Sequence, residues 1–444
     1  MKAITSPPVQ DFAGLLRKGL EVPAFLQALS SPLVGGKYLH WDKLRFHKPP
    51  ASLTLELWWA AIKLARRANR QQLSLVDTKH THFSYVLPDV AQQLMHELSM
   101  ALGSNLRLEE RVANKESRDR YLISSLIEEA ITSSQLEGAA TTRKVAEHML
   151  RSGRKPRDSN EQMIVNNYRA MQRVNSLGDV DLTPVLVFEL HSILTEDVLP
   201  EANRGRTRRP DASDDDIAVY DNVTNEVLHQ PPPASELARR MDLMCQFANG
   251  RDKSGFVHPI VRAIVLHFWL AYDHPFVDGN GRTARALFYW AMKRGGFWLC
   301  EYLAISSIIR KAPARYQRAY LESETDDNDL TYFLLYHLRV LDQATKALES
   351  FIEAKREEIQ RVNVKLKGVA TLNHRQRELI LHAIRHPGHE YTFASHRNSH
   401  GVAYQTARTD LLDLQDRGLL RKFLRGKQLV FVAQDGLEEK LAKG

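Results

Sequence analysis

The stretch from residue 260 to 272 is apolar on nearly every face of a helix, and this limits how the chain can fold more than any other feature does. A helix of this kind must be surrounded by other elements, because no side of it is suited to water. The sequence therefore predicts a buried central helix that delivers His274 from inside the core. The apolar residues of the stretch include Ile264, Val265, Leu266, Phe268, Trp269 and Leu270.

The next twelve residues, 274–285, read His-Pro-Phe-Val-Asp-Gly-Asn-Gly-Arg-Thr-Ala-Arg. They supply a titratable base, a carboxylate, a glycine-rich turn and two guanidinium groups. A second helix is expected over 283–293, so Gly279-Asn280-Gly281 would open it. Glycines allow successive N–H groups to converge, and a helix N-terminus favours anions, so this turn should hold a diphosphate. The helix is indicated by Ala284, Leu287, Phe288 and Ala291, with Gly295 and Gly296 as stop signals.

The dodecamer resembles the signature of the Fic family, His-Pro-Phe-x-Asp/Glu-Gly-Asn-Gly-Arg-x-x-Arg, and meets it at every fixed position. Each residue alone has an ordinary structural explanation, but a stability motif does not need this combination. The resemblance extends over residues 116 to about 345. It implies a mainly α-helical fold, a Fic-type bundle with a small β-hairpin flap. It also implies transfer of a nucleoside monophosphate, usually AMP from ATP, to a hydroxyl of a target protein.

The resemblance assigns a role to most residues of the motif. His274 would be the general base, since a histidine with an ordinary pKa is largely neutral at pH 7. Asp278 would hold Mg²⁺, which prefers oxygen ligands and shares its coordination with substrate phosphates. Asn280, with the N–H groups of Gly279 and Gly281, would surround the α- and β-phosphates.

Two arginines and a tyrosine complete the expected ATP site. Arg282 would contact the leaving diphosphate, and Arg285, one turn further along, would reach the terminal phosphate. Tyr316 is expected near the adenine, although Tyr316 and Tyr320 are one helical turn apart and could equally be core residues. Relatives that transfer phosphate alone have a lysine where Gly281 stands, which argues against that chemistry here.

Residues 131–138 read Ile-Thr-Ser-Ser-Gln-Leu-Glu-Gly and close a stretch with apolar residues at helical spacing. Fic proteins that restrain themselves carry Ser/Thr-x-x-x-Glu-Gly/Asn on a helix, and Ser133, Glu137 and Gly138 fit this form. The resemblance implies that the Glu137 carboxylate pairs with Arg285 and keeps ATP in an unproductive position. The alternative is an ordinary surface glutamate at a helix end.

Residues 216–229 predict two short strands around a turn, followed by Pro231 to Pro233. They are similar to the Fic flap, in which Val227, Leu228 and His229 would pair with the backbone of the target protein by strand addition. A plain surface hairpin is the other interpretation.

The C-terminal segment has the pattern of a winged helix, with helices over 375–386, 392–398 and 403–416 and a hairpin over 419–432. In the third helix Ala403, Ala407, Leu411 and Leu414 should face inward, and Tyr404, Gln405 and Arg408 outward. Residues 371–444 hold twelve Lys and Arg against eight Asp and Glu, which leaves +4 of the chain's +8. This moderate positive charge is compatible with DNA binding but does not require it, and winged-helix domains also bind proteins. The expected wing carries Arg421, Lys422, Arg425 and Lys427.

A chain of 444 residues exceeds what one core usually supports. We expect an N-terminal helical region over 1–115, a Fic core over 116–345, a connecting helix over 346–370 and the winged helix over 371–444. The N-terminal region, with helices such as 55–68 and 90–102, should brace the core, select targets or support a homodimer. Two distant cysteines imply no disulfide, and the absence of a signal peptide or membrane span predicts a cytoplasmic protein.

Three functions remain open at this stage. The first is a protein adenylyltransferase that uses Mg²⁺ and ATP and is held in check by Glu137. The second is an enzyme that removes AMP from a modified protein, with Glu137 orienting water. The third is a DNA-binding regulator whose nucleotide-bound Fic core acts as a switch.

Overall fold

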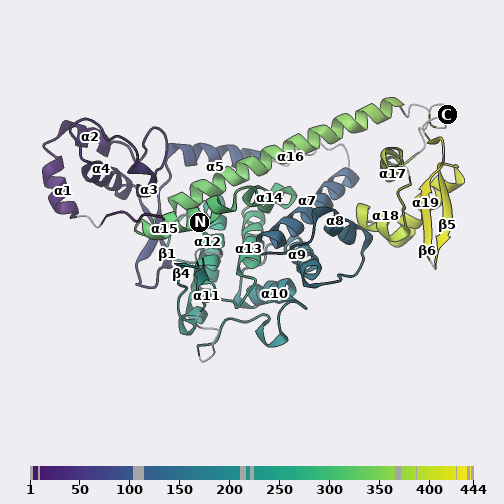
Figure 1. Ribbon diagram of the computed structural model, residues 1–444, viewed down its shortest axis with the longest axis horizontal. Helices are drawn as coiled ribbons and strands as arrows, with labels where there is room; N and C mark the ends of the chain where they lie inside the picture. Colours follow the sequence, from purple (N-terminus) through teal and green to yellow (C-terminus); the bar gives the residue numbers. More distant parts are fainter. Residues whose placement is uncertain are drawn as a thin grey trace. The chain divides into compact units, whose positions relative to one another are not determined.

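The computed structural model describes residues 4–8, 11–103, 115–210, 217–220, 225–365, 372–386, 388–426, 428–437 and 441. Over these residues the chain is mainly helical, and the strands form three two-stranded antiparallel pairs (Figure 1). The predicted fold class is therefore confirmed. The chain divides into two compact units, one made of residues 1–103, 169–300 and 305–343, the other of 104–168, 301–304 and 344–444.

The first unit begins with a helical subdomain whose core contains the fully buried side chains of Phe25, Leu44 and Trp59. Residues 1–103 belong to the same compact unit as residues 169–300. The elements are α1 (Phe12–Gly19), α2 (Pro23–Leu29), α3 (Trp41–Leu44), α4 (Leu55–Arg67), β1 (Gln71–Val76), β2 (His82–Tyr85) and α5 (Asp89–Leu102).

The N-terminal helical region also contains the hairpin β1–β2, which the sequence analysis did not predict. Leu73 and Leu75 alternate with more exposed neighbours and are buried, which is the pattern of a strand with one covered face. The Ser84 backbone then accepts from Leu330 N at 2.8 Å and donates to Asn328 O at 3.1 Å. These partners are remote in sequence, so local periodicity could not indicate them.

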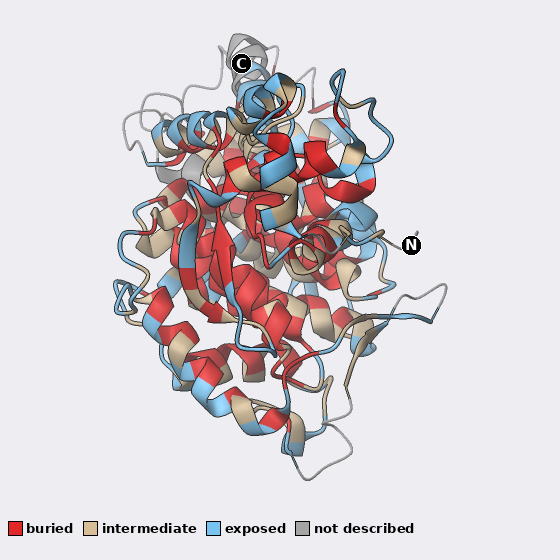
Figure 2. Cartoon of the chain, turned by 90° about the vertical axis from the view of Figure 1, so that its left-hand side faces the viewer, coloured by how far each residue is buried: buried red, intermediate tan, exposed pale blue. Residues whose placement is uncertain are grey.

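The predicted central helix is α12 (Pro259–Asp273), which packs mainly against α13 (Asn280–Arg294). Leu266, Phe268 and Leu270 have no exposed surface, so the all-round apolar pattern was a reliable indication of burial. Figure 2 shows buried residues concentrated on the inner helices. The other elements of this part are α10 (Pro184–Thr195), η1 (Glu201–Asn203), β3 (Val219–Tyr220), β4 (Val227–His229), η3 (Ala234–Glu236), α11 (Leu237–Ala248), η4 (Trp298–Tyr302), α14 (Ile305–Arg310) and α15 (Pro313–Thr325).

A long helix, α16 (Thr331–Lys365), runs through the region where a separate connecting helix was expected. Residues 346–365 continue a helix that already begins at Thr331, and residues 366–370 lie outside the described part. No helix of the described residues has both the length and the apolar character that a membrane span requires.

The second unit contains α7 (Lys115–Leu136), α8 (Arg143–Ser152), the start of α9 (Ser159–Ser176), and residues 372–441, which we call the C-terminal module. Ala407, Leu411 and Leu414 are fully buried as predicted, but Ala403 is the exposed N-cap of α19 and does not face inward. Lys427 lies outside the described residues. The elements of the module are α17 (His374–Arg385), α18 (Phe393–His400), α19 (Tyr404–Asp416), β5 (Leu420–Arg425) and β6 (Gln428–Ala433).

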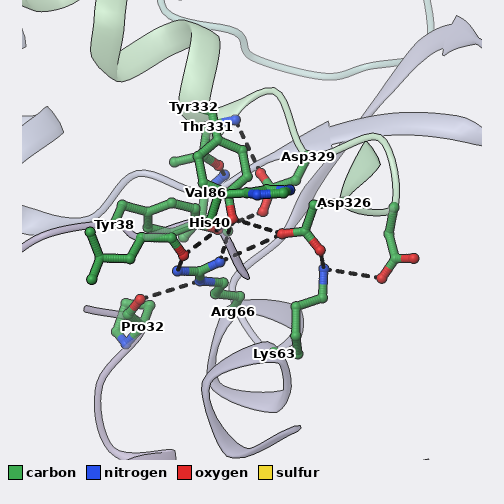
Figure 3. Close-up of polar contacts among 12 residues, drawn as sticks. Pro32, Tyr38, His40, Lys63, Arg66, Val86, Asp326, Asp329, Thr331 and Tyr332 are labelled. Carbon is green, nitrogen blue, oxygen red and sulfur yellow. Dashed lines mark hydrogen bonds and ion pairs between the residues drawn. The ribbon is translucent and has the colours of Figure 1, made fainter. Parts of the chain in front are cut away.

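A cluster of buried charges ties α4 to the loop between α15 and α16 (Figure 3). Lys63 Nζ lies 2.5 Å from Asp326 Oδ1, and Tyr332 donates to Asp326 Oδ2 at 2.7 Å. The Arg66 guanidinium donates to the Tyr332 hydroxyl at 2.7 Å and lies over the Tyr38 ring at 3.6 Å. Buried charges are tolerated when they are paired in this way, and removing one partner leaves the other uncompensated.

Replacing Asp326 with Asn should therefore lower the free energy of unfolding by about 3 to 5 kcal/mol, because Lys63 would remain buried without its closest counter-charge. Asp327→Asn is the matched control, since the Asp327 side chain is 53% exposed although it also lies 3.0 Å from Lys63. The control should lose less than about 1 kcal/mol. Urea unfolding of the full chain measures both, and equal losses would show that burial of the cluster is unimportant.

Candidate active site

His274 begins the motif directly after the central helix. Its N–H donates to Leu270 O at 3.0 Å, and its backbone is left-handed, with φ of 44°. Few residues other than glycine adopt this conformation, and helices often end on a residue that does. The turn directs the chain out of α12 at His274.

The end of α12 is fixed by a buried ion pair one residue earlier. Asp273 accepts from Arg240 Nε at 2.7 Å and from Trp269 Nε1 at 3.0 Å. Burial raises the pKa of Asp273, while the charge of Arg240 and the hydrogen bonds from Arg240 and Trp269 oppose this rise. These contacts anchor the helix end that carries His274.

Asn280 closes the loop that leads to α13. Its side chain accepts from Phe276 N at 2.9 Å and donates to Phe276 O at 2.8 Å, and the residue is 3% exposed. The resemblance assigns this side chain to phosphate binding, whereas the structure uses it to hold the loop.

Gly279 is the N-cap of α13 and has φ of 86°, which favours glycine. A Cβ atom at this position would lie 3.0 Å from Thr195 Cγ2 and 3.3 Å from His191 Cδ2, so a side chain here would crowd α10. The positive φ of Gly279 strongly favours glycine here, and the close approach of α10 adds to this preference.

The N-terminus of α13 binds an anionic group of the protein itself. Asp278 Oδ1 accepts from Gly279 N at 2.6 Å, and Asp278 Oδ2 lies 3.2 Å from Arg282 NH2. This is the arrangement expected where a helix dipole and a guanidinium attract negative charge. The Asp278 side chain is 50% exposed, so its oxygens remain accessible from solvent.

One accessible carboxylate fits a cation that takes most of its ligands from outside the protein. Mg²⁺ commonly takes one or two protein carboxylates and completes its shell with phosphates and water. Among the described residues there is no cluster of three or more acidic, His or Cys side chains that could hold a metal by itself. Asp278 thus suits a metal whose remaining ligands come from a bound molecule and from water.

Both motif arginines are buried, with 1% of Arg282 and 2% of Arg285 exposed. Arg282 NH1 donates to Leu194 O at 2.9 Å, which fixes its guanidinium at the C-terminal end of α10. Buried guanidinium groups near a helix N-terminus make the surroundings strongly attractive to anions.

His191 was missed by the sequence analysis. Its Nδ1 accepts from Gly205 N at 3.0 Å, so its Nε2 is the N–H that donates to Asp278 O at 2.9 Å. The ring stacks on Phe276 at 3.8 Å, and burial lowers its pKa to about 4. On an apolar helix, such a histidine carries no local signal of a role in the motif loop.

Arg208 was also missed, and it supports the other end of the motif. Arg208 N donates to Pro275 O at 2.8 Å, and Arg208 Nε donates to His274 O at 3.0 Å. Its NH2 group donates to Pro232 O at 2.9 Å, which links the segment after β4 to the motif.

The predicted flap strands are present, with Val219 opposite His229 and Tyr220 opposite Val227. Residues 216 and 221–224 lie outside the described part. Val227 is 55% exposed, but His229 is anchored through Tyr272 O at 2.7 Å and Glu324 Oε2 at 2.7 Å. Burial lowers the pKa of His229, and Glu324 outweighs this effect so that the pKa is raised. Val227 is thus available to a partner, while the His229 side chain holds the strand.

Tyr316 lies in an aromatic cluster. Its hydroxyl is 2.8 Å from His267 Nε2 and 3.0 Å from the Tyr320 hydroxyl. Burial holds the pKa of His267 well below its usual value, and electrostatic interactions with His337 and Arg285 lower it further. The contacts fit a core role for Tyr316 without requiring adenine.

The three predicted regulatory residues lie at the end of α7, in the second unit. Ser133 is buried and Glu137 half-buried, and Gly138 is exposed with φ of 96°. Glu137 N donates to Ser134 O at 3.1 Å, and Ala139 N donates to the same carbonyl at 3.0 Å. Glu137 therefore lies in a hydrogen-bonded turn just beyond the helix.

Comparisons with known proteins agree with the motif. Residues 181–292 match the Fic/DOC family. The chain is 41% identical over 69 residues to "Protein adenylyltransferase Fic" of Nematostella vectensis, a match that covers 16% of each chain. It is 31% identical over 164 residues to the protein of the same name from Drosophila melanogaster, covering 36% of this chain and 30% of the relative. The chain thus spans less than a third of these relatives.

A solved Fic family protein from Desulfovibrio desulfuricans G20 resembles the chain in fold, with a TM-score of 0.51 and 18% identity. The likeness covers 79% of this chain and 98% of that one.

Substitution of His191 should change how stability depends on pH. Because the folded pKa of about 4 is below the unfolded value of about 6.5, protonation favours unfolding as the pH falls through this window. His191 should therefore contribute full stability above pH 6.5 and lose about 3 kcal/mol of it by pH 4. Urea unfolding of His191→Gln should show a shallower decline between these pH values than wild type does, with Gln162→Ala as a control of unchanged slope. Parallel declines for wild type and His191→Gln would contradict the assignment.

Proposed function

We propose that this chain, which carries a Fic domain over residues 181–292, is a protein adenylyltransferase that transfers AMP from ATP to a Ser, Thr or Tyr hydroxyl of a target protein. The observation that carries the proposal is the anion site directly after His274. There, the N-terminus of α13, buried Arg282 and buried Arg285 are combined with an accessible carboxylate on Asp278.

The reaction follows from the chemistry of these groups. The target hydroxyl oxygen forms a bond to the α-phosphorus of ATP, and the bond from this phosphorus to the α,β-bridging oxygen breaks. His274 accepts the hydroxyl proton, and diphosphate leaves with the bonding electrons. Arg282 and the N-terminus of α13 stabilise the negative charge that grows on the phosphates.

Asp278 would hold Mg²⁺ together with the phosphates, and the cation would neutralise charge on the leaving diphosphate when it is bound. Arg282 already contacts the Asp278 carboxylate at 3.2 Å, so the carboxylate is oriented from the protein side. The flap would present the target, since Val227 is exposed and its strand is anchored by His229.

Glu137 is proposed to restrain the enzyme by pairing with Arg285 in the resting state. Support comes from the Ser133, Glu137 and Gly138 pattern and from the turn that holds Glu137 just beyond α7. A guanidinium paired with a carboxylate cannot also orient a γ-phosphate, so ATP would bind without reacting.

Two alternatives use the same residues. Glu137 could instead orient water, and the enzyme would then remove AMP from a modified protein. The chain could also be a DNA-binding regulator with a nucleotide-sensing Fic core. The outward face of α19 fits DNA through exposed Gln405 and Arg408, but Arg425 of the hairpin lies 2.6 Å from Glu390 and is already paired.

Labelled ATP distinguishes these functions. With Mg²⁺ and a cell lysate as the source of target, Glu137→Gly should transfer label from α-labelled ATP about a hundredfold faster than wild type, because Arg285 becomes free to orient the nucleotide. ATP labelled at the γ position should give no labelled protein. Adding His274→Ala should reduce transfer by about a hundredfold or more.

A different outcome would support one of the alternatives. If Glu137→Gly abolishes removal of AMP from a pre-modified protein and adds none, the hydrolase is correct. If His274→Ala changes neither reaction nor occupancy of DNA, the regulator is favoured.

The metal role of Asp278 has its own test. Asp278→Asn in the Glu137→Gly background should raise the Mg²⁺ concentration that gives half-maximal transfer by about tenfold or more, since the charged ligand is lost. Asp197→Asn is the matched control, because the Asp197 side chain is 72% exposed and its nearest ionic partner is Arg204. Equal Mg²⁺ dependence in the two variants would remove Asp278 from the metal site.

A further inference from the structure

The C-terminal module and the predicted inhibitory segment belong to one compact unit. Residues 104–168 and 344–444 are clustered together, although residues 169–343 separate them in the sequence. Within this unit α18 packs against both α7 and α8. The helix α7, which ends just before Glu137, therefore has the C-terminal module as a direct neighbour.

The contact is close on both helices. A Cβ atom on Gly401 would lie 3.1 Å from Ile123 Cδ1, and one on Gly153 would lie 2.8 Å from Asn398 Nδ2. We call Ile123, Gly153, Asn398 and Gly401 the α18 seam. These glycines let side chains of the facing helices approach the backbone closely, and α18 packs against both α7 and α8, so a displacement of α18 would disturb this packing.

The α7 side of the seam continues as a packed core up to the regulatory residues. Ile123 packs against a buried cluster that includes Ile127 and Ile131 of α7 together with Ala146 and Met149 of α8. Ser134, three residues before Glu137, donates to Met163 O at 3.2 Å and accepts the backbone hydrogen bond of Glu137. The position of Glu137 is thus determined by the same core that α18 contacts.

The module side of the seam is connected to its outward surface by a buried carboxylate. Asp410 of α19 accepts from Arg375 Nε of α17 at 2.6 Å and lies 3.1 Å from His396 Nε2 of α18. Asp410 and His396 are nearly completely buried and Arg375 is partly exposed, and their contacts join α17, α18 and α19 to each other. A partner that displaces α19 would also displace α18.

We propose that the C-terminal module is the regulatory domain of the enzyme: through the α18 seam it holds α7 in the position that keeps Glu137 inhibitory, and displacement of α18 relieves the inhibition. The effect on Glu137 rests on the proposed function, whereas the mechanical coupling of α18 to α7 does not. The coupling has two discrete states, seam closed and seam open, and any partner that prefers the open state activates transfer in proportion to that preference.

The test substitutes residues of the C-terminal module and measures the rate of hydrogen exchange in α7. In the full-length chain, Asn398→Arg places a larger, charged side chain at the seam, and Gln405→Arg places the same side chain on the exposed face of α19. Hydrogen exchange of residues 124–136 should be at least about tenfold faster in Asn398→Arg than in wild type. Gln405→Arg should leave it unchanged. Ile123→Ala opens the seam from the other side and replaces Asn398→Arg if that variant does not fold.

Transfer of AMP then tests the consequence for Glu137. Asn398→Arg should raise the transfer rate, and combining it with Glu137→Gly should add nothing to the rate of Glu137→Gly alone. Unchanged exchange of residues 124–136 in both seam variants would overturn the coupling. Faster exchange with wild-type transfer, while Glu137→Gly alone is active, would overturn the regulatory role. If Glu137→Gly shows no transfer, the proposed function fails, and exchange alone decides the coupling.

Discussion

The loop between α12 and α13 keeps its shape because side chains from other elements, and from the loop itself, bind its backbone. His191 donates to Asp278 O, Arg208 donates to His274 O, and Asn280 bonds to both backbone groups of Phe276. A buried loop lacks the regular backbone hydrogen bonds of a helix or a sheet. Its N–H and C=O groups therefore need side-chain partners such as these. The two left-handed residues, His274 and Gly279, are tolerated because this network over-determines the turn.

The periodic elements could be predicted from the sequence, since their signal is local. The all-apolar stretch 260–272 became α12, and the glycine-rich turn became the N-terminus of α13. His191 and Arg208 could not be predicted, because their acceptors lie 87 and 66 residues away along the chain. The same limit applies to β1–β2, which is completed by the backbone on either side of Asp329. The role of a polar residue in an apolar segment depends on partners that are remote in sequence. Such a role is therefore visible only once the fold is known.

Asn280 and His229 have structural contacts that the motif alone does not indicate. The side chains of both residues hold their own segments. The roles that the resemblance implies, phosphate binding for Asn280 and backbone pairing with the target for His229, stay predictions. A correctly shaped backbone is itself a binding surface. The backbone N–H groups at the start of α13 and the two buried arginines remain the groups best placed to meet an anion.

The α18 seam matters for how shortened forms of this chain behave. Ending the protein before residue 372 removes the helix that covers part of α7 and α8, and it leaves the surface around Ile123 in water. Such a fragment would have an uncovered apolar surface, which favours self-association and loosens the helix pair beneath it. In a fragment that ends before residue 372, α7 and α8 would lack the packing that α18 provides. Activity or stability measured on such a fragment would therefore differ from that of the full chain for this reason as well.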